Sequence, residues 1–512
     1  GAGAGAGTVY VHEQLPELLD SAVLLYHLGL SGSFKQASFQ MQSQMQAIAQ
    51  LGDTDRRIRQ SEVKTGDFLK HLKEARGVFR DDVVESVRQC AWHRAMLFTR
   101  WKQEGMFACC AYVVRLLMAL SAREKAFGYV AEFYVETLVD SFHALRRGDP
   151  PFAPTATLLE KGLGGVVTFL VTHFNDARIV NPDVRDVLLQ SISVLLQYKE
   201  YVEAFEANAA ARETMVGALL SSFDSRFWIP ISNILLRLCK GSGFGHRTRK
   251  AAECSSERFQ RLLHETCSKD EKLFNNFLNR LFNTLNWTVT EFSVAMKEMQ
   301  DTISRRQVPD LQQQQRKCSI MFELSVNLER ILEFLTYDMP HAFLASKAAP
   351  GVKGGEVKPA MNMARLCELV VFVLDHTTCG PDARLFEATL RLNMQPLEKI
   401  NRAHILAPIV GILVNLSAAG KSLAAAHSTT GGDPASSPPT ISKALTAVEC
   451  RLDNFNYLRD FDWAASFPDD PSLRRLPELE WFLEELREDA ASAKKVADDA
   501  EARRAAGKGK AG

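Results

Sequence analysis

The segment best suited to binding an anion is the glycine-rich stretch KGSGFGHRTRK at residues 240–250. Its glycines are Gly241, Gly243 and Gly245, and the basic residues that follow are Arg247, Arg249 and Lys250. A dinucleotide-binding loop needs G-x-G-x-x-G spacing between a strand and a helix, so that the phosphates meet the helix N-terminus. Here the spacing is G-x-G-x-G, a helical pattern comes before the glycines, and no G-K-[ST] follows. The pattern favours a helix end over a phosphate site.

The preceding helix is predicted to end at Lys240–Gly241. A lysine complements the negative end of a helix dipole, and a glycine readily adopts the left-handed conformation that ends a helix. Either Gly241 or Gly243 is expected to adopt it. A mobile basic loop is expected to continue to about Ser256, with no assigned role for its arginines.

Two H-x-x-C pairs could supply zinc ligands, because residues three apart share a face of a helix. The pairs are His264/Cys267 and His376/Cys379, which lie in separate segments. The chain has no C-x-x-C, and twelve histidines and ten cysteines produce such pairs by chance. The stretch LHETCS also begins like a zinc-protease helix, but Ser268 stands where the second histidine ligand would be.

Nucleophilic catalysis has no clear candidate either. The chain has no G-x-S-x-G motif, and Cys109 and Cys110 lie in the apolar stretch MFACCAYVVRLLMAL, where buried thiols are usually inert. The basic clusters at 55–60 and 245–250 lack interleaved aromatic residues and are predicted to be solvated surface. We therefore assign no catalytic, cofactor-binding or metal-ligating residue.

The overall composition is that of an ordinary folded protein. Among 512 residues, Lys+Arg and Asp+Glu both number 61, and a balanced charge argues against a protein that coats nucleic acid. The ten cysteines lie mostly in apolar stretches, which is typical of reduced thiols inside the cell. The longest apolar runs, 108–114 and 369–374, are too short to span a membrane. We expect a cytoplasmic protein, with the nucleus as a second candidate compartment, and no nucleic-acid or membrane partner.

Helical periodicity covers almost the whole chain. At residues 181–205, Asn181 is a suitable N-cap and Pro182 suits the first helical position. The residues that then share one face of this helix are Val184, Val187, Leu188, Ile192, Leu195 and Leu196. The segment 228–239 repeats this pattern, with Pro230 near its start.

The segment 273–287 has the clearest apolar stripe. Its members are Phe274, Phe277, Leu278, Leu281, Phe282 and Leu285, while Asn275, Asn276, Asn279 and Arg280 lie away from it. Such a stripe needs a partner helix to bury it. No strand pattern or hairpin signal occurs.

These patterns predict an all-α protein, an irregular helical-repeat solenoid of the armadillo or HEAT kind with flexible Gly/Pro/Ser linkers. The expected regions are a disordered Gly/Ala lead (1–10), an N-terminal helical region (11–149), a central helical solenoid (155–345), a linker (346–361), a helical region (362–417), a flexible linker (418–442), a C-terminal helical segment (443–486) and a polar mobile tail (487–512).

Several long blocks resemble one known family. They lie at residues 25–44, 97–108, 170–206, 228–245, 277–300, 364–376 and 400–416. In this order they resemble the large plant RING/SPRY ubiquitin ligases of the RKP type, a family related to the catalytic subunit of the Kip ubiquitination-promoting complex. The resemblance runs from about Val11 to about Leu486. Residues 178–192 are also similar to the elongated core of the U-box chain-elongation factors.

The resemblance implies a ligase that promotes ubiquitin transfer to proteins such as cell-cycle kinase inhibitors, which are then degraded. The family has a SPRY domain upstream and a zinc-binding RING at its C-terminus. This chain has no C-x-x-C, so no RING ligand can be placed on it, and zinc is expected only in the missing RING. The expected partners are a ubiquitin-conjugating enzyme through that RING, and protein substrates and an adaptor subunit through the helical scaffold. These 512 residues alone are expected to be inactive.

A second interpretation remains open at this stage. A helical adaptor that has lost its RING would show the same patterns without being an enzyme. The resemblance therefore predicts a scaffold or interaction region in either case.

Overall fold

The computed structural model shows an all-helical protein. It describes residues 14–508 apart from 62–66, 149–151, 225, 240–242, 246–254, 306–307, 345–360, 381, 392–396, 398, 430–439 and 449. Within these ranges the elements are helices joined by turns, and no strand occurs. The predicted all-α, solenoid-like fold is confirmed.

The chain divides into two compact units, residues 1–195 with 203–211, and residues 196–202 with 212–512. The elements up to the boundary are α1 (Leu15–Ser61), α2 (Asp67–Leu97), α3 (Arg100–Ser121), α4 (Glu124–Phe127), α5 (Glu132–Arg147), α6 (Thr155–Leu158), the π-helix η1 (Leu159–Leu163), α7 (Gly164–His173), α8 (Pro182–Leu195) and α9 (Lys199–Ala207). The predicted division near residue 150 therefore differs from the observed one, because α5 packs against α8 and keeps the segment up to Leu195 with the first unit.

The remaining elements belong to the second unit, except that Ala211, the first residue of η2, belongs to the first unit. They are η2 (Ala211–Met215), α10 (Val216–Ser221), α11 (Trp228–Cys239), α12 (Glu257–Lys269), α13 (Glu271–Ser304), α14 (Val308–Asp338), α15 (His341–Leu344), α16 (Met361–Thr377), α17 (Ala383–Arg391), α18 (Arg402–Thr429), α19 (Ile441–Thr446), α20 (Leu452–Asp460), α21 (Trp463–Ser466), the 3-10 helix η6 (Pro471–Arg475) and α22 (Leu476–Lys508).

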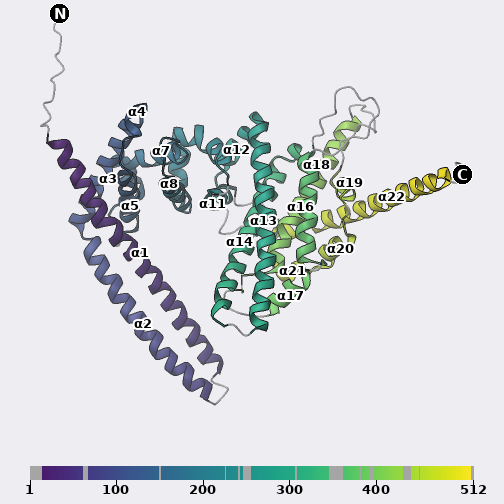
Figure 1. Ribbon diagram of the computed structural model, residues 1–512, viewed down its shortest axis with the longest axis horizontal. Coiled ribbons are helices and arrows are strands. Elements are labelled where there is room, and N and C mark those ends of the chain that lie inside the picture. The colour runs from purple at the N-terminus through teal and green to yellow at the C-terminus, as the bar shows by residue number, and fades with distance from the viewer. Residues whose placement is uncertain are drawn as a thin grey trace, which may run out of the picture. The chain divides into compact units, whose positions relative to one another are not determined.

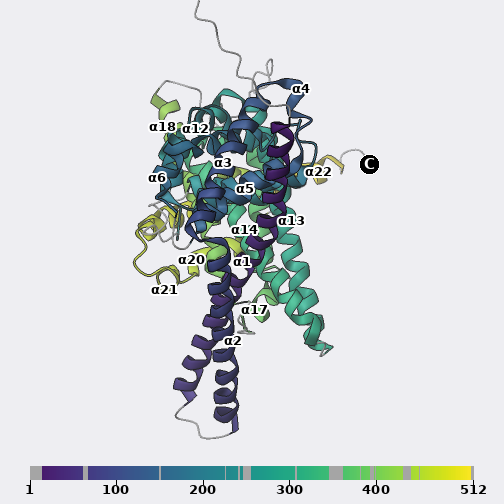
Figure 2. The same ribbon diagram turned by 90° about the vertical axis from the view of Figure 1, so that its left-hand side faces the viewer.

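In the first unit, α1 and α2 form a long antiparallel pair (Figures 1 and 2). The N-terminal part of α1 also packs against α5, and Tyr134 Oη of α5 donates a hydrogen bond of 2.9 Å to Asp20 Oδ1. Helix α3 packs against α5 and α7, and α8 packs against the same two helices. The pair is therefore anchored to the helical repeats at one end.

In the second unit, α13 and α14 pack along their lengths, and α18 lies against α14. The stripe predicted on 273–287 is buried, and its partner is α14. The predicted cap at Asn181 is also confirmed, because its Oδ1 accepts a 2.9 Å hydrogen bond from the Asp183 N–H. Helix α12 begins after Ser256, whose Oγ accepts from the N–H of Phe259.

The predicted linker at 418–442 begins too early. Helix α18 continues to Thr429, because the alanine-rich stretch that follows Ser417 has a high helix propensity that outweighs one glycine. The tail predicted from 487 is helical as far as Lys508, as part of α22. The predicted lead at 1–10 and the linker at 346–360 lie outside the described residues.

Two helices, Arg100–Ser121 and Arg402–Ala426, are long and apolar enough to cross a membrane by length and composition. The sequence prediction counted only uninterrupted apolar runs and therefore missed them. In the second helix, 83% of the apolar window is buried, which is typical of a core helix. In α3 only 28% of the apolar window is buried, and the buried residues include Val113, Val114 and Leu117. The expectation that the protein has no membrane partner stays a prediction.

The α13 stripe allows a direct test of the core. Phe277 is buried and its ring lies 5.0 Å from that of Phe223, so Phe277→Ala should lower the free energy of unfolding by about 3–5 kcal/mol. The neighbouring Asn276 is exposed, and Asn276→Ala should change it by less than about 0.5 kcal/mol. Urea unfolding followed by circular dichroism measures both, and equal effects would contradict the assignment of the stripe.

Candidate functional site

The first candidate zinc pair, His264 and Cys267, lies on α12, and the two side chains have different environments. Nδ1 of His264 lies 3.2 Å from Oδ2 of Asp338 on α14. Cys267 is buried, and burial raises the pKa of its thiol to about 12, with the negative charge of Asp338 adding to the rise. A thiol must lose its proton to bind zinc, so this environment opposes metal binding.

The second pair lies at the end of α16. Nδ1 of His376 lies 2.8 Å from the carbonyl oxygen of Phe372, and its Nε2 lies 3.4 Å from Oδ2 of Asp382. Cys379 is exposed, and its Sγ contacts the carbonyl oxygen of Asp453 at 3.7 Å. Across the ranges that the structure describes, no group of three or more His, Cys, Asp or Glu side chains could hold a metal ion.

The adjacent cysteines on α3 have the environment expected of inert thiols. Cys110 is fully buried, and burial raises the pKa of its thiol far above the ordinary value. Burial also raises the pKa of Cys109 to about 11. Neither thiol forms an appreciable amount of thiolate at neutral pH, which a nucleophile requires.

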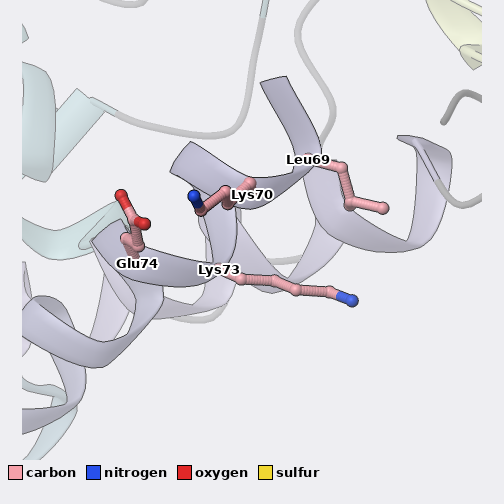
Figure 3. Close-up of a pocket in the computed structure, with 4 residues that line it drawn as sticks. All are labelled: Leu69, Lys70, Lys73 and Glu74. Atoms are coloured by element: carbon pink, nitrogen blue, oxygen red, sulfur yellow. The ribbon is translucent and has the colours of Figure 1, made fainter. Parts of the chain in front are cut away.

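A surface hollow on α2 does not gather reactive groups. Its lining residues are Leu69, Lys70, Lys73 and Glu74, all from one short stretch of a single helix. Figure 3 shows that these four side chains spread outward in different directions instead of converging on one point. Enzyme sites are normally concave and bring polar groups from several elements together.

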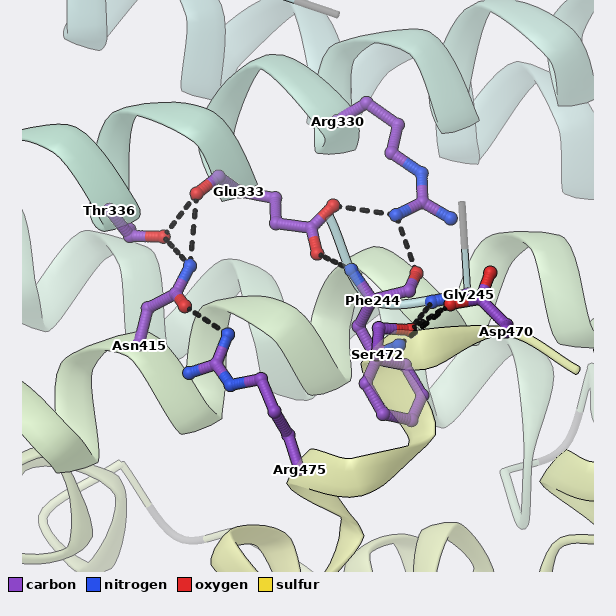
Figure 4. A network of polar contacts seen from close by, with 9 residues as sticks. All are labelled: Phe244, Gly245, Arg330, Glu333, Thr336, Asn415, Asp470, Ser472 and Arg475. Atoms are coloured by element: carbon purple, nitrogen blue, oxygen red, sulfur yellow. Dashed lines mark hydrogen bonds and ion pairs between the residues drawn. The ribbon is translucent and has the colours of Figure 1, made fainter. Parts of the chain in front are cut away.

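The glycine-rich segment proves to be an anion-binding element inside the second unit. The N–H of Phe244 donates a 2.6 Å hydrogen bond to Oε1 of Glu333 on α14. Nη1 of Arg330, one helical turn earlier, donates to Oε2 of Glu333 at 2.6 Å and to the carbonyl oxygen of Phe244 at 2.7 Å. The segment and the carboxylate therefore share one guanidinium (Figure 4).

The next residue ties the segment to η6. The N–H of Gly245 donates to Oγ of Ser472 at 2.8 Å, and that hydroxyl donates to Oδ1 of Asp470 at 2.6 Å. Gly245 has a left-handed φ of 64°, and a Cβ atom there would lie 2.7 Å from the ring of Phe467. Conformation and space both require glycine at this position.

Helix α18 joins the network through Asn415. Its Nδ2 donates to the carbonyl oxygen of Glu333 at 3.1 Å, and its Oδ1 accepts from Nη1 of Arg475 at 2.8 Å. Thr336 donates to the same Glu333 carbonyl at 2.9 Å. The loop before α12, helices α14 and α18, and η6 thus meet around one glutamate (Figure 4).

The space around this carboxylate is filled. A Cβ atom on Gly243 would lie 2.9 Å from Oε2 of Glu333, and one on Gly411 of α18 would lie 1.8 Å from Oε1. Among the described residues, no substrate-sized space is left beside the carboxylate at these two positions. The arrangement is therefore a structural cross-link and not a binding site for a small molecule.

Two glutamates on α14 have contrasting environments. Burial raises the pKa of Glu333 above its ordinary value, although Arg330 and the N–H of Phe244 oppose this rise by favouring the charged form. Glu329 lies one turn earlier, is fully buried, and neither of its carboxyl oxygens has a hydrogen-bond partner within the described part of the chain. Burial raises the pKa of Glu329 well above its ordinary value, and Glu333 adds to this while Arg330 opposes it. This environment favours the neutral, protonated form of Glu329.

The predictions for the glycine-rich segment need correction. Gly245, and not Gly243, has the left-handed conformation, while Gly241 and the basic residues at 247–250 lie outside the described residues. Gly243–Gly245 is held in place by buried contacts, so the part of the loop that is described is not a free basic loop. The glycines do allow the backbone to approach an anionic group closely, but that group is the carboxylate of Glu333 and not a bound ligand.

Comparisons with known proteins agree with the resemblance given by the sequence. Residues 275–493 match a family model described as RNF123-like, TPR repeat. The E3 ubiquitin-protein ligase RKP of Arabidopsis thaliana is 47% identical over 484 residues, which cover 93% of this chain and 35% of that protein. The chain thus spans about a third of the length of this curated relative. The predicted resemblance is confirmed.

Helix α18 offers a matched pair of glycines to test the network. Gly411→Ala places a methyl group where Oε1 of Glu333 lies, and should lower the free energy of unfolding by at least about 2 kcal/mol. At Gly420 a Cβ atom meets nothing within 4 Å, so Gly420→Ala should stabilise the helix by up to about 1 kcal/mol. Thermal unfolding of both variants measures the difference, and similar melting temperatures would contradict the close approach.

The buried carboxyl of Glu329 should make stability depend on pH. Because its pKa is raised on folding, its favourable contribution is complete below the unfolded pKa of about 4.3 and is lost as pH rises toward the folded pKa. Within that window the wild type should lose about 1.4 kcal/mol per pH unit relative to Glu329→Gln.

Urea unfolding of wild type and Glu329→Gln between pH 5 and pH 8 measures this trend. Glu484 is exposed and provides the control, since Glu484→Gln should leave the pH dependence unchanged. A constant difference between wild type and Glu329→Gln across the range would show that Glu329 is charged in the folded protein.

Proposed function

We propose that this chain is the helical scaffold of a RING-type ubiquitin ligase, and that it holds protein substrates for ubiquitin transfer. The observation that carries the proposal is the 47% identity to an E3 ubiquitin-protein ligase over 93% of the chain. The match to a TPR-repeat family model supports a role in binding, because stacked helical repeats present extended surfaces to protein partners.

The mechanism proposed for the ligase is proximity. A RING-type ligase forms no covalent intermediate with ubiquitin, and it brings a charged conjugating enzyme near a substrate lysine. Its scaffold must therefore keep distant surfaces at a fixed spacing. Cross-links such as Glu333 with Phe244 and Asn415, which join segments 89 and 82 residues apart, give the second unit this rigidity.

The finer parts of the proposal concern partners and location. We infer that a RING elsewhere in the longer ligase holds zinc and recruits the conjugating enzyme, and that an adaptor subunit binds the helical scaffold. Cell-cycle kinase inhibitors are the proposed substrates. The proposed location is the cytoplasm, with the nucleus as a second compartment.

A competition experiment tests the scaffold. The longer ligase is incubated with activating enzyme, conjugating enzyme, ubiquitin and a recombinant cyclin-dependent kinase inhibitor, with increasing amounts of this 512-residue chain. The added chain should bind the inhibitor without transferring ubiquitin, so modification of the inhibitor should fall while self-modification of the ligase continues. If an excess of the chain neither binds the inhibitor nor reduces its modification, the scaffold does not hold this substrate.

Deletion of the corresponding segment from the longer ligase distinguishes two hypotheses: that this region is the scaffold of the ligase, and that it is an independent adaptor. The deleted ligase should retain self-modification, because the RING is intact, and should lose modification of the inhibitor. Undiminished modification of the inhibitor would favour the adaptor function, in which this helical region does not serve the ligase.

A further inference from the structure

Helix α1 is apolar on two opposite sides. Its inward residues Val23, Leu30, Phe34 and Ala37 are buried within the first unit. At about 100° per residue, these four positions share one side of the helix. Helix α1 packs against α2, α3 and α5.

The outward side of α1 also has large apolar side chains. The exposed fractions are 66% for Leu18, 70% for Leu25, 67% for Leu28 and 67% for Phe39. Helical periodicity places these four on the side opposite the buried residues. A helix that is apolar all round is normally covered on both sides.

Two glycines interrupt this outward face, although no neighbouring atom of the chain requires a glycine at either position. Gly29 and Gly32 lie in the middle of a 47-residue helix, and a Cβ atom at either position would meet nothing within 4 Å. Each glycine costs the helix about 1 kcal/mol relative to alanine. A shallow notch between Leu25 and Gln36 would accommodate side chains from a second helix.

The charges on this part of α1 are sparse and of opposite sign. Lys35 is the only lysine, arginine, aspartate or glutamate between Ser21 and Gly52, and Glu17 lies in the first turn. Eighteen residues separate Glu17 from Lys35, which is about five full turns, so both lie on the same edge of the outward face about 27 Å apart. Both are exposed, and within the described ranges neither has an ion-pair partner.

We propose that the outward face of α1 binds a second copy of this chain in an antiparallel pairing, with Glu17 of each copy opposite Lys35 of the other. A two-fold axis that passes near Tyr26 produces this arrangement. Each residue of one copy then lies opposite the residue of the other copy whose number brings the sum of the two to about 52, as 17 and 35 do. The inference is independent of the proposed ligase function. Both ion pairs form at once, as a symmetric interface requires.

Two of the four outward apolar residues, Leu28 and Leu18, fit the same register. Leu28 of one copy lies opposite Leu24 of the other, and Leu18 lies between Gly32 and Gln36, where the glycine leaves space. A parallel pairing would place Glu17 beside Glu17 and Lys35 beside Lys35. The charge distribution therefore favours the antiparallel pairing over the parallel one.

Sedimentation equilibrium of the 512-residue chain from 1 to 100 µM tests the pairing. We expect a concentration-dependent mass that rises toward twice the 57.1 kDa of one chain. Glu17→Lys alone and Lys35→Glu alone should each raise the dissociation constant about tenfold, because like charges then face each other twice. The double variant Glu17→Lys/Lys35→Glu should return it to within about threefold of wild type.

Apolar variants provide a second measurement. Leu25→Asp should raise the dissociation constant by at least about a hundredfold, because it places two carboxylates near the two-fold axis. Met45 is 68% exposed but lies away from the outward face, so Met45→Asp should leave the dissociation constant unchanged. Circular dichroism at 222 nm should be the same for every variant.

Two results would overturn the proposal. A wild-type chain that stays at 57.1 kDa up to 100 µM would show that another partner, or a segment of a longer chain, covers the outward face of α1. A dimer that the double charge exchange does not restore would show that the copies associate elsewhere or in another register.

Discussion

A carboxylate can be buried in a helical core only where donors surround it, and Glu333 imposes this requirement on the second unit. Its side chain is 2% exposed and accepts from the Arg330 guanidinium and the Phe244 N–H. The desolvation of an ionised carboxylate is too costly without such donors. The loop before α12 and the glycine on α18 must therefore occupy their observed positions for the carboxylate to be stable.

The same unit uses a row of asparagines to align two helices. Asn275, Asn279 and Asn283 follow one another at intervals of four residues on α13, and α16 contacts all three. Asn362 donates to Asn275 at 2.8 Å, and Arg365 binds the other two asparagines. An apolar interface tolerates small shifts, whereas each of these hydrogen bonds has a preferred geometry, so the polar contacts determine the register of the two helices.

These features agree with the scaffold role proposed for this chain. The apolar stripe of α13 is buried in the core, and the polar cross-links restrict how the helices can slide. The proposed function would require such fixed spacing, because in proximity-based ubiquitin transfer the rate depends on how often the substrate lysine meets the charged conjugating enzyme. The outward face of α1 adds a second means of arranging copies of the scaffold, through Glu17 and Lys35.

The sequence by itself determined the helical class, the α13 stripe, the cap at Asn181 and the resemblance to the ligase family. All of these depend on local periodicity, on capping chemistry within a few residues, or on the similarity of long blocks. The Glu333 network could not be predicted in this way. Residues that are hydrogen-bonded to each other in this network lie up to 227 residues apart, and nothing in the local pattern of residues 241–245 shows which anion their backbone will meet. Only the tertiary structure brings Glu333, Ser472 and the glycine segment together, because long-range packing decides which donors share a buried site.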